Sequence, residues 1–546
     1  MASSAKDSAP GRFQPVDLAL GLGLLLFLGC YVYFHLDLRG RPEEDAAMLM
    51  RYSRHLAAGH GIVWNIGEKP VDGATDFLFM LLLAGVHKLG VSLEAGARGI
   101  GLAAHAATVW LVFWAARALF GASRPWALVP AVFLAVGPGL RHLAAGYGTP
   151  LFALVATVAW IFACRLANAP PERLRRLALL FALSSLGMGL ARPEGVFLAG
   201  FMLLAVLVSR EGRGLGAIVG PFLLVFLTLG LGYFLWRFHY FGYPLPNPFY
   251  KKGAFLLHWH SLRQSWKNLW TLALPFVWLL PLGLAVRQAR RAALFVTLPV
   301  VLFATLFILI SDETNYVMRF RYPLLPLLLI GCVPVAQALH ERWRGKLALP
   351  GWATLALALA VAGLLAFAQH RAYRFVAPQR QGLYDAALVL RDYAPRGFAL
   401  VTTEAGLLPL VSEWRAVDAW GLNDAYIAHH GGIDESYLDR YRPELVVFHA
   451  YFSPRVADHG ERVETRSLGR PWYRMVMTLK GYAESRGYEL AACFGRNEWD
   501  THYYYVRPGF PQSREIIARL RALDYYWDGE PTLDLAAPHR PADATE

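Results

Sequence analysis

Residues 16–36, VDLALGLGLLLFLGCYVYFHL, form an apolar run of the length that a helix needs to cross a lipid bilayer. The run follows Lys6 and Arg12, is too long for the core of a signal peptide, and is not closed by an A-x-A cleavage site. We therefore expect a membrane anchor. Of the 546 residues, 56% are hydrophobic and only 17% are charged, whereas about a quarter of a soluble chain is charged. The sequence predicts an α-helical polytopic membrane protein.

Ten further apolar runs are candidate spans, and one run is too short to cross. The short run is FLFMLLLAGV, residues 77–86, followed by His87 and Lys88. The ten longer runs are 98–116, 126–141, 149–166, 174–191, 194–209, 215–238, 270–286, 292–310, 323–339 and 349–369.

Short basic segments determine the expected topology. All of them fall on one side of the membrane only if residues 77–86 do not cross, and the positive-inside rule makes that side cytoplasmic. We therefore interpret residues 77–86 as an interfacial helix. The prediction is about eleven transmembrane helices, a cytoplasmic N-terminus (residues 1–15) and a C-terminus outside. The basic segments are the N-terminus, 117–124, 165–176, 210–213, 287–291 and 342–346.

The expected membrane domain covers residues 16–369 and has two long outer loops. The loop 37–97 should carry interfacial helices, and the second loop is 239–269. From residue 370 onward, short strand-like runs such as ELVVFHA alternate with turns and helix-like polar stretches. We predict a small mixed α/β extracytoplasmic domain over residues 370–546, with a disordered end, DLAAPHRPADATE.

Charge, cysteine and histidine patterns argue against several other classes. The net charge of +13 could indicate nucleic acid, but most Lys and Arg residues flank apolar runs, so membrane lipids are the expected partner and nucleic acid is not. The four cysteines show neither zinc spacing nor a disulfide framework. Six histidines also form no closed ligand set, and a surface or structural role is expected for them. They are His55, His60, His258, His260, His429 and His430.

Acidic residues open the first outer loop. Pro42, Glu43, Glu44 and Asp45 are typical of a helix start, and the helix would lay an apolar face on the membrane surface. In one interpretation these acids only cap that helix. In the other, a carboxylate just outside the bilayer takes the proton of an acceptor hydroxyl, and a pKa raised by apolar surroundings suits that role.

Basic residues in the outer loops run against the positive-inside trend. Arg and Lys bind phosphate through charge-assisted hydrogen bonds, and at headgroup depth they could hold the phosphate group of a lipid-linked substrate. Each could instead extend toward anionic lipid headgroups. These residues are Arg141, Arg192, Lys251, Lys252, Arg319 and Arg321.

The first outer loop resembles a known family. Residues 44–79, EDAAMLMRYSRHLAAGHGIVWNIGEKPVDGATDFLF, are similar to the first-loop signature of the AftB-like arabinofuranosyltransferase branch of the GT-C glycosyltransferases. The segments ARPEG (191–195), PLPNPFYKK (244–252), RFRYPLLP (319–326) and VDAWGLND (417–424) extend the resemblance over nearly the whole chain. It implies a GT-C-like fold.

The resemblance also implies roles for individual residues. Asp45 would be the general base, and Glu44 would support it or share a bound cation. The donor phosphate would be bound by Arg192, Lys251, Lys252, Arg319 and Arg321. Donor or acceptor would contact Arg51, Tyr52, Trp64, Asn65, Asp72, Thr75, His142, Tyr147, Asn247 and Tyr250.

Four positions depart from the family pattern. Glu44 replaces an Asp, which keeps the charge but lengthens the side chain. Asp76 stands where Asn is expected, and Pro248 replaces a Thr. Gly148 precedes the TPLF segment in place of a Glu, whose role His142 or Tyr147 would take over.

The resemblance implies an enzyme of the bacterial inner membrane whose active site faces the periplasm. Its donor would be a polyprenyl-phosphate sugar, with arabinofuranose as the implied sugar, and its acceptor an outer glycan, lipid or protein. The one cofactor considered is a divalent cation, Mg²⁺ or Mn²⁺, that Glu44 and Asp45 could hold. The alternatives are a transporter or flippase of lipid-linked sugars and a structural subunit. Charges in outer loops and the lack of a visible repeat argue against a transporter.

Overall fold

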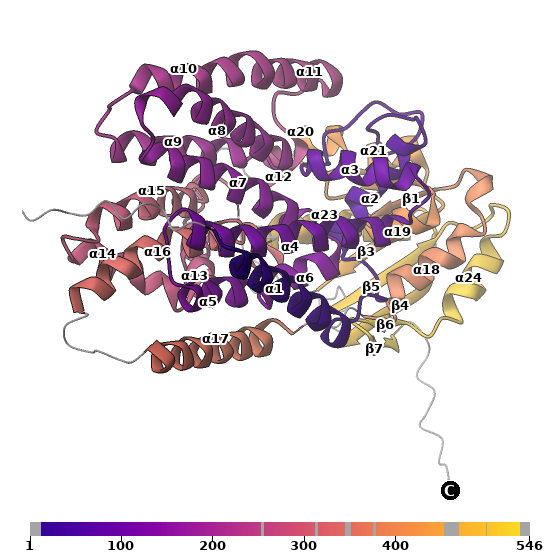
Figure 1. The fold of residues 1–546 in the computed structure, drawn as a ribbon. Helices are drawn as coiled ribbons and strands as arrows, with labels where there is room; N and C mark the ends of the chain where they lie inside the picture. The colour runs from indigo at the N-terminus through magenta and orange to yellow at the C-terminus, as the bar shows by residue number, and fades with distance from the viewer. Residues whose placement is uncertain are drawn as a thin grey trace, which may run out of the picture.

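The computed structural model describes residues 13–252, 256–311, 315–343, 351–374, 378–451, 469–497 and 500–535. Within these ranges, a large helical part is followed by a smaller domain built on a β-sheet (Figure 1). The predicted fold class, a polytopic helical protein with a C-terminal α/β domain, is confirmed. Most of the end that the sequence predicts to be disordered lies outside the described residues.

Eight helical segments of the described chain are long and apolar enough to cross a membrane. Helices suit these runs because a helix satisfies its backbone hydrogen bonds internally. The segments are α1 (Pro15–His35), α4 (Leu93–Ala118), α5 (Arg124–Ala135) with α6 (Gly139–Ala145), α7 (Thr149–Ala167), α8 (Pro171–Ala191), α10 (Leu215–Val225) with η1 (Phe226–Gly230) and α11 (Leu231–Phe241), α16 (Leu324–Trp343), and α17 (Gly351–Tyr373).

The remaining predicted spans correspond to broken or shorter helices. The helix α13 (Trp259–Ala273) and the pair η2 (Phe276–Trp278) and α14 (Leu279–Ala285) together pass the same test, but they are bent by 106°. The helices α9 (Gly195–Ser209) and α15 (Arg290–Leu306) have 15 and 17 residues. Each of the predicted runs is therefore helical in the structure, although not all of them are full-length spans.

Ion pairs and hydrogen bonds join the basic segments at one end of the helical part. The Asp17 carboxylate, at the start of α1, accepts from Arg117 at 2.9 Å and from Arg124 at 2.8 Å. Arg210, after α9, donates to the carbonyl oxygen of Leu166 at the end of α7, 2.8 Å away. These contacts are what the predicted topology requires of segments that share one side of the membrane.

The short helix α3 (Phe77–Lys88) does not carry the chain across. Arg98, near the start of α4, donates through Nη2 to the carbonyl oxygen of Gly40, just after α1, at 2.5 Å. The chain between α1 and α4 thus returns to the end that it left.

The helix α2 (Glu44–Ala57) corrects one expectation. Its apolar residues, such as Met50 and Tyr52, are buried, and they do not lie on a membrane surface. The helix packs between α3 and α19 (Leu407–Ser412), which belongs to the C-terminal domain. An apolar helical face indicates that the helix packs against something apolar. The pattern is the same whether that surface is protein or lipid.

The C-terminal domain contains a six-stranded mixed sheet in the order β2-β1-β3-β5-β4-β8. The strand β1 pairs in parallel with β2 and β3, and β5 pairs antiparallel with β3 and β4. The strands are β1 (Ala399–Thr402), β2 (Arg415–Asp418), β3 (Leu445–Ala450), β4 (Glu489–Asn497), β5 (Asp500–Val506) and β8 (Leu533–Asp534).

Helices cover both faces of this sheet. One face packs against α18 (Gly382–Arg391), α19 and α24 (Ser513–Arg521), and the other against α21 (Glu435–Tyr441) and α23 (Gly469–Ser485). Residues of α2 and α3 belong to the first of these two cores. The first outer loop and the sheet domain therefore form one packed unit, which fixes α2 above the helical part.

Candidate active site

A cavity of about 450 Å³ lies beside the start of α2. Distant parts of the sequence line it: α2, the turn after α8, the segment around α12 (Asn247–Lys252), the end of α15 and residues 319–320. One part of the wall is charged and the other is apolar. Its charged residues are Asp45, Asp76, Arg192, Glu194, Lys252 and Arg319.

The carboxylate of Asp45 forms an ion pair across this cavity. Arg319 donates through Nη2 to Asp45 Oδ2 at 2.5 Å, and the Arg319 guanidinium lies 4.7 Å from the centre of the Tyr147 ring. Burial alone would raise the pKa of Asp45, but Arg319 and Lys252 together hold this pKa below its ordinary value. A raised pKa is what apolar surroundings alone predict for this base, and the structure differs because two cations outweigh those surroundings.

Arg192 lies between two further carboxylates. It donates through Nη1 to Asp76 Oδ1 and through Nε to Glu194 Oε1, both at 2.5 Å. Burial raises the pKa of Asp76 in spite of Arg192. Asp76 is a cavity residue that the sequence reasoning missed, although a charged Asp where the family pattern has Asn is a signal that could have identified it.

Lys252 completes the charged wall. Burial lowers the pKa of its ammonium group to about 8, and the repulsion of Arg319 and Arg192 acts in the same direction. The attraction of Asp45 raises this pKa but does not cancel the other effects. The three cations and three carboxylates of the wall therefore stand in balance, and Lys252 is the cation whose charge is most easily lost.

The other part of the cavity wall is apolar and reaches the surface of the helical part. Leu306, Phe307 and Ile310 lie on this side. Leu256 and Leu309 also line it and are 63% and 51% exposed, respectively. The cavity therefore has a charged end and an apolar opening.

Glu44, the neighbour of Asp45, points away from the cavity. Its carboxylate accepts hydrogen bonds from the backbone N–H groups of Gly406, at 2.8 Å, and Leu407, at 3.2 Å. Burial and the nearby Glu404 raise its pKa well above the ordinary value. The two neighbouring acids therefore have separate surroundings in the structure. This differs from the expectation that Glu44 supports Asp45 as the base or shares a bound cation with it.

Four further predicted binding residues also lie outside the cavity wall. The buried Arg51 donates to the carbonyl oxygens of Trp64, at 2.8 Å, Pro409 and Trp414, and Tyr52 donates to Asn423. These contacts join the first outer loop to the C-terminal domain. They give the four residues of the family motif a structural role that requires no ligand. The four residues are Arg51, Tyr52, Trp64 and Asn65.

Two of the predicted phosphate-binding cations have other surroundings. Lys251 Nζ lies 4.5 Å from the Trp420 ring, whereas Lys252 beside it faces the cavity. Arg321 is completely buried, with its guanidinium 3.4 Å from the Phe307 ring centre. Neither lines the cavity, and the prediction that they bind the donor phosphate there is not supported by their positions.

The remaining predicted residues divide between the cavity and the scaffold. Thr75 and Tyr147 line the cavity. Of the two candidates to replace the missing Glu, Tyr147 is thus the one at the site, and His142 is buried with its ring 5.1 Å from that of Tyr322. Asp72 forms an ion pair with Arg237.

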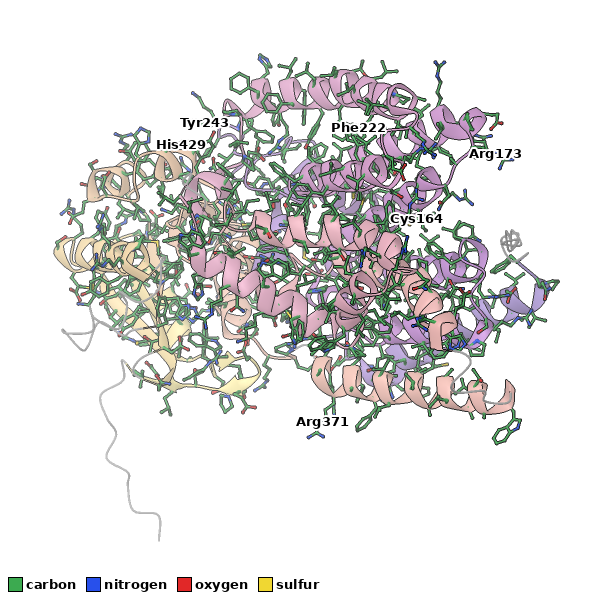
Figure 2. The ribbon with its side chains drawn as sticks, turned by 90° about the vertical axis from the view of Figure 1, so that its left-hand side faces the viewer. Cys164, Arg173, Phe222, Tyr243, Arg371 and His429 are labelled. Carbon is green, nitrogen blue, oxygen red and sulfur yellow. The ribbon has the colours of Figure 1, made fainter. Side chains whose placement is uncertain are left out.

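Two residues of the second outer loop hold α12 in place. Asn247 donates its backbone N–H to the carbonyl oxygen of Asp72 at 3.0 Å. The Tyr250 ring lies 4.4 Å from that of His429, which in turn stacks on Tyr243 at 3.8 Å. Figure 2 shows Tyr243 and His429 close together at the edge of the molecule. Tyr250 therefore ties α12 to the C-terminal domain and lies outside the cavity wall.

The sequence is similar to that of known proteins over parts of its length. Residues 368–507 match a family described as a domain of unknown function, DUF8728. A stretch of 268 residues is 25% identical to the terminal beta-(1->2)-arabinofuranosyltransferase of Mycobacterium tuberculosis (strain ATCC 25618 / H37Rv). That match covers 46% of this chain and 42% of the relative, so it spans less than half of the relative's length.

The fold is similar to solved structures over almost the whole chain. The crystal structure of ArnT from Cupriavidus metallidurans bound to undecaprenyl phosphate superposes with a TM-score of 0.54 at 14% identity, covering 91% of this chain and 99% of that one. The same protein in the apo state gives a TM-score of 0.52 at 14% identity, with coverage of 91% and 98%. The chain therefore has a GT-C-like fold, and part of its sequence is similar to that of an arabinofuranosyltransferase.

Proposed function

We propose that the protein is a membrane glycosyltransferase that transfers a monosaccharide from a polyprenyl-phosphate donor to a hydroxyl group of an acceptor. One observation carries the proposal: Asp45 and the cations Arg192, Lys252 and Arg319 line a single cavity that opens through an apolar wall. Similarity to an arabinofuranosyltransferase supports arabinofuranose as the sugar. The acceptor is proposed to be an extracytoplasmic glycan, lipid or protein.

The charged end of the cavity suits a phosphate. Arg319 and Arg192 each offer several N–H donors in a planar fork, and Lys252 adds a compact ammonium group. In the structure each of the three cations is attracted to a carboxylate of the cavity wall. A phosphate that enters competes with these carboxylates for the cations, and the leaving phosphate then develops its charge against donors that are already in position.

The apolar wall suits a prenyl chain. Leu256, Leu309 and Ile310 continue the cavity from the cations to the lipid-facing surface. Each methylene group that leaves water contributes about 0.8 kcal/mol. A donor with a phosphate head and a long branched hydrocarbon tail therefore matches both ends of the cavity.

The proposed reaction is a direct displacement at the anomeric carbon. The acceptor oxygen forms the new bond to that carbon while the bond from the carbon to the phosphate oxygen breaks, and the phosphate leaves with the electron pair. The acceptor proton passes to the carboxylate of Asp45. The lowered pKa keeps Asp45 ionised near neutral pH and hence ready to accept it. When the phosphate engages Arg319, the Asp45 carboxylate becomes available to the acceptor hydroxyl.

A divalent cation at Glu44 and Asp45 is a separate proposal. The Glu44 carboxylate accepts backbone N–H groups of the C-terminal domain, and the Asp45 carboxylate accepts from Arg319. A cation shared by the two acids would have to displace these partners. The reaction proposed above uses the side-chain cations of the cavity for the phosphate.

We place the enzyme in the inner membrane of a bacterium, with the cavity facing the periplasm. The support is the charge distribution: the basic segments around Asp17 and Arg210 meet at the end of the helical part where α1 begins, and the cavity lies beyond the end where α1 stops. Basic loops favour the cytoplasmic side.

The test is turnover of synthetic polyprenyl-phosphate arabinofuranose by purified protein in detergent. We expect Asp45→Asn to lower turnover by at least about 100-fold, the contribution of a general base, with little change in donor affinity or thermal stability. The matched control is Asp392→Asn, because Asp392 is exposed, pairs with Arg519 and does not line the cavity.

Two outcomes would contradict the proposal. Near-normal turnover by a folded Asp45→Asn protein would remove the base assignment. Movement of intact donor across proteoliposomes without transfer of sugar would favour the flippase instead. Parallel assays with mannose and glucose donors test the choice of sugar.

A further inference from the structure

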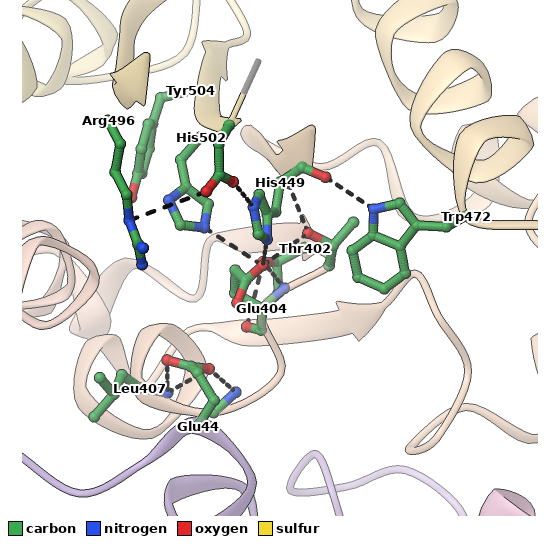
Figure 3. A network of polar contacts seen from close by, with 12 residues as sticks. Glu44, Thr402, Glu404, Leu407, His449, Trp472, Arg496, His502 and Tyr504 are labelled. Atoms are coloured by element: carbon green, nitrogen blue, oxygen red, sulfur yellow. Dashed lines mark hydrogen bonds and ion pairs between the residues drawn. The ribbon is translucent and has the colours of Figure 1, made fainter. Parts of the chain in front are cut away.

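Two histidines and a glutamate meet in the C-terminal domain, outside the cavity described above. His449 on β3 and His502 on β5 are directly paired across antiparallel strands, and Glu404 follows β1, the other neighbour of β3. One ligand atom from each of these three side chains lies within 4.8 Å of the other two (Figure 3). The proposed sugar transfer uses none of them.

The distances within this cluster suit a tetrahedral metal ion. Glu404 Oε1 lies 3.5 Å from His449 Nδ1 and 3.5 Å from His502 Nε2. Two ligands held about 2.0–2.1 Å from zinc at tetrahedral angles stand ~3.3 Å apart. Two of the three distances between ligand atoms are therefore already close to those around a tetrahedral ion.

The nitrogen of His502 that faces the cluster is poorly satisfied by the protein. His502 Nε2 is buried and, although Glu404 lies within ion-pair distance, makes no hydrogen bond of good geometry to any residue in the described ranges. A buried imidazole nitrogen without such a partner costs free energy unless something else binds it. A metal ion would bind this nitrogen.

Each histidine is also oriented by a partner at its other ring nitrogen. His449 Nε2 lies 2.7 Å from Asp500 Oδ1, and His502 Nδ1 lies 3.4 Å from the Tyr525 hydroxyl. Such outer contacts fix the tautomer and direction of metal-binding histidines, and a carboxylate behind a histidine is the most frequent form. In this arrangement His449 Nδ1 and His502 Nε2 both face Glu404.

The surroundings favour a cation over a neutral cluster. Carboxylate oxygens of Asp500 and Glu404 lie 2.7 Å and 3.5 Å from the two ring nitrogens of His449. The negative charge of these two carboxylates favours a divalent ion beside them. The Trp527 ring stacks on His502 at 4.3 Å and limits the access of water.

We propose that Glu404, His449 and His502 bind one divalent metal ion of the zinc class, with water as a fourth ligand. Two imidazoles and one carboxylate form a ligand set that zinc accepts readily. His449 is the most exposed of the three side chains, at 23%, so the fourth position opens on its side. The ion cross-links β1, β3 and β5 at one end of the sheet.

The metal ion would also act on the active site through the chain that follows β1. Glu404 is two residues before Gly406, whose N–H group binds Glu44, and Glu44 is adjacent to Asp45. A cation bound to Glu404 would fix the short turn from Glu404 to Gly406. The metal therefore positions the segment that holds α2, and it contacts no reacting atom.

The experiment measures metal in the full-length protein purified in detergent. After dialysis against metal-free buffer and addition of ZnCl₂, we expect about one zinc per chain by elemental analysis and a higher thermal midpoint. Cobalt should replace zinc and give the visible spectrum of a tetrahedral site. Glu404→Gln and His449→Gln should each lose the bound ion, and the control His430→Gln, at an exposed histidine, should retain it.

A second variant distinguishes a metal site from a merely structural cluster. Asp500→Asn leaves all three ligands in place but removes the carboxylate behind His449, so zinc affinity should fall about 10- to 100-fold. The proposal is overturned if the wild type binds no zinc in the titration, or if folded Glu404→Gln and His449→Gln proteins bind it as the wild type does. If these variants fail to fold, the zinc titration and cobalt spectrum of the wild type decide.

Discussion

Lys252 sets the expected alkaline limit of the reaction. Its pKa of about 8 means that the ammonium group is charged below this pH and neutral above it. Because the charged form holds the donor phosphate, kcat/KM should fall above pH 8, by up to about tenfold per pH unit. Lys252→Arg keeps the positive charge, so its pH profile should extend to higher pH.

The adjacent lysine provides the control. Lys251 lies over the Trp420 ring and does not line the cavity, so Lys251→Arg should leave the alkaline limb where it is in the wild type. Equal shifts in both variants would contradict the role of Lys252.

The positions of some site residues could be predicted from the sequence, but the directions of their side chains could not. The charges of Asp45 and Arg319 could be assigned to one site from their outer-loop positions and the family motifs. The division of labour between Glu44 and Asp45 could not, because neighbouring residues on a helix point about 100° apart and the sequence does not give the rotation of α2. The ion pairs around Arg192 depend equally on tertiary contacts.

At the scale of elements, the contact between α2 and the C-terminal domain requires a glycine. A methyl group at Gly406 would collide with the backbone of Glu44. We expect Gly406→Ala to destabilise the protein by about 1–3 kcal/mol, the usual cost of overpacking, and to lower turnover because α2 carries Asp45. Thermal unfolding in detergent measures the first effect.

Gly481 serves as the comparison for this change. It lies in α23, and a methyl group there meets no atom within 4 Å. Alanine favours helix over glycine by up to about 1 kcal/mol, so Gly481→Ala should leave stability unchanged or slightly higher. A neutral effect of Gly406→Ala would show that α2 tolerates a shift away from the domain.

Elements were predictable where one local pattern governs them. Apolar runs of about 20 residues gave the spans, since only helices satisfy the backbone in lipid. The alternating strand-like runs gave the sheet domain. The pairing of His449 with His502 lies beyond such reasoning, because 52 residues separate them and only the register of β3 on β5 brings them together.

At the scale of the whole molecule, the cavity joins the aqueous end of the protein to its lipid-facing surface. Donor tails should therefore bind more tightly with each added prenyl unit until the chain leaves the apolar wall, and then level off. Each buried methylene group contributes about 0.8 kcal/mol. The measurement is KM for donors of increasing tail length at fixed detergent concentration.

A charged substitution provides the complementary variant. Ile310→Lys places an ammonium group in the apolar wall, so it should abolish the gain from longer tails while affecting the shortest donor little. A dependence on tail length that is the same in both proteins would mean that the tail binds elsewhere.

The opposite directions of Glu44 and Asp45 have a consequence for variation of this protein. Exchanging the two letters preserves composition, net charge and helix propensity, yet it shortens the arm that reaches the amides after β1 and lengthens the one beside Arg319. Both substitutions are conservative by residue type. Together they would weaken the hydrogen bonds that hold α2 to the C-terminal domain and would leave less space beside Arg319.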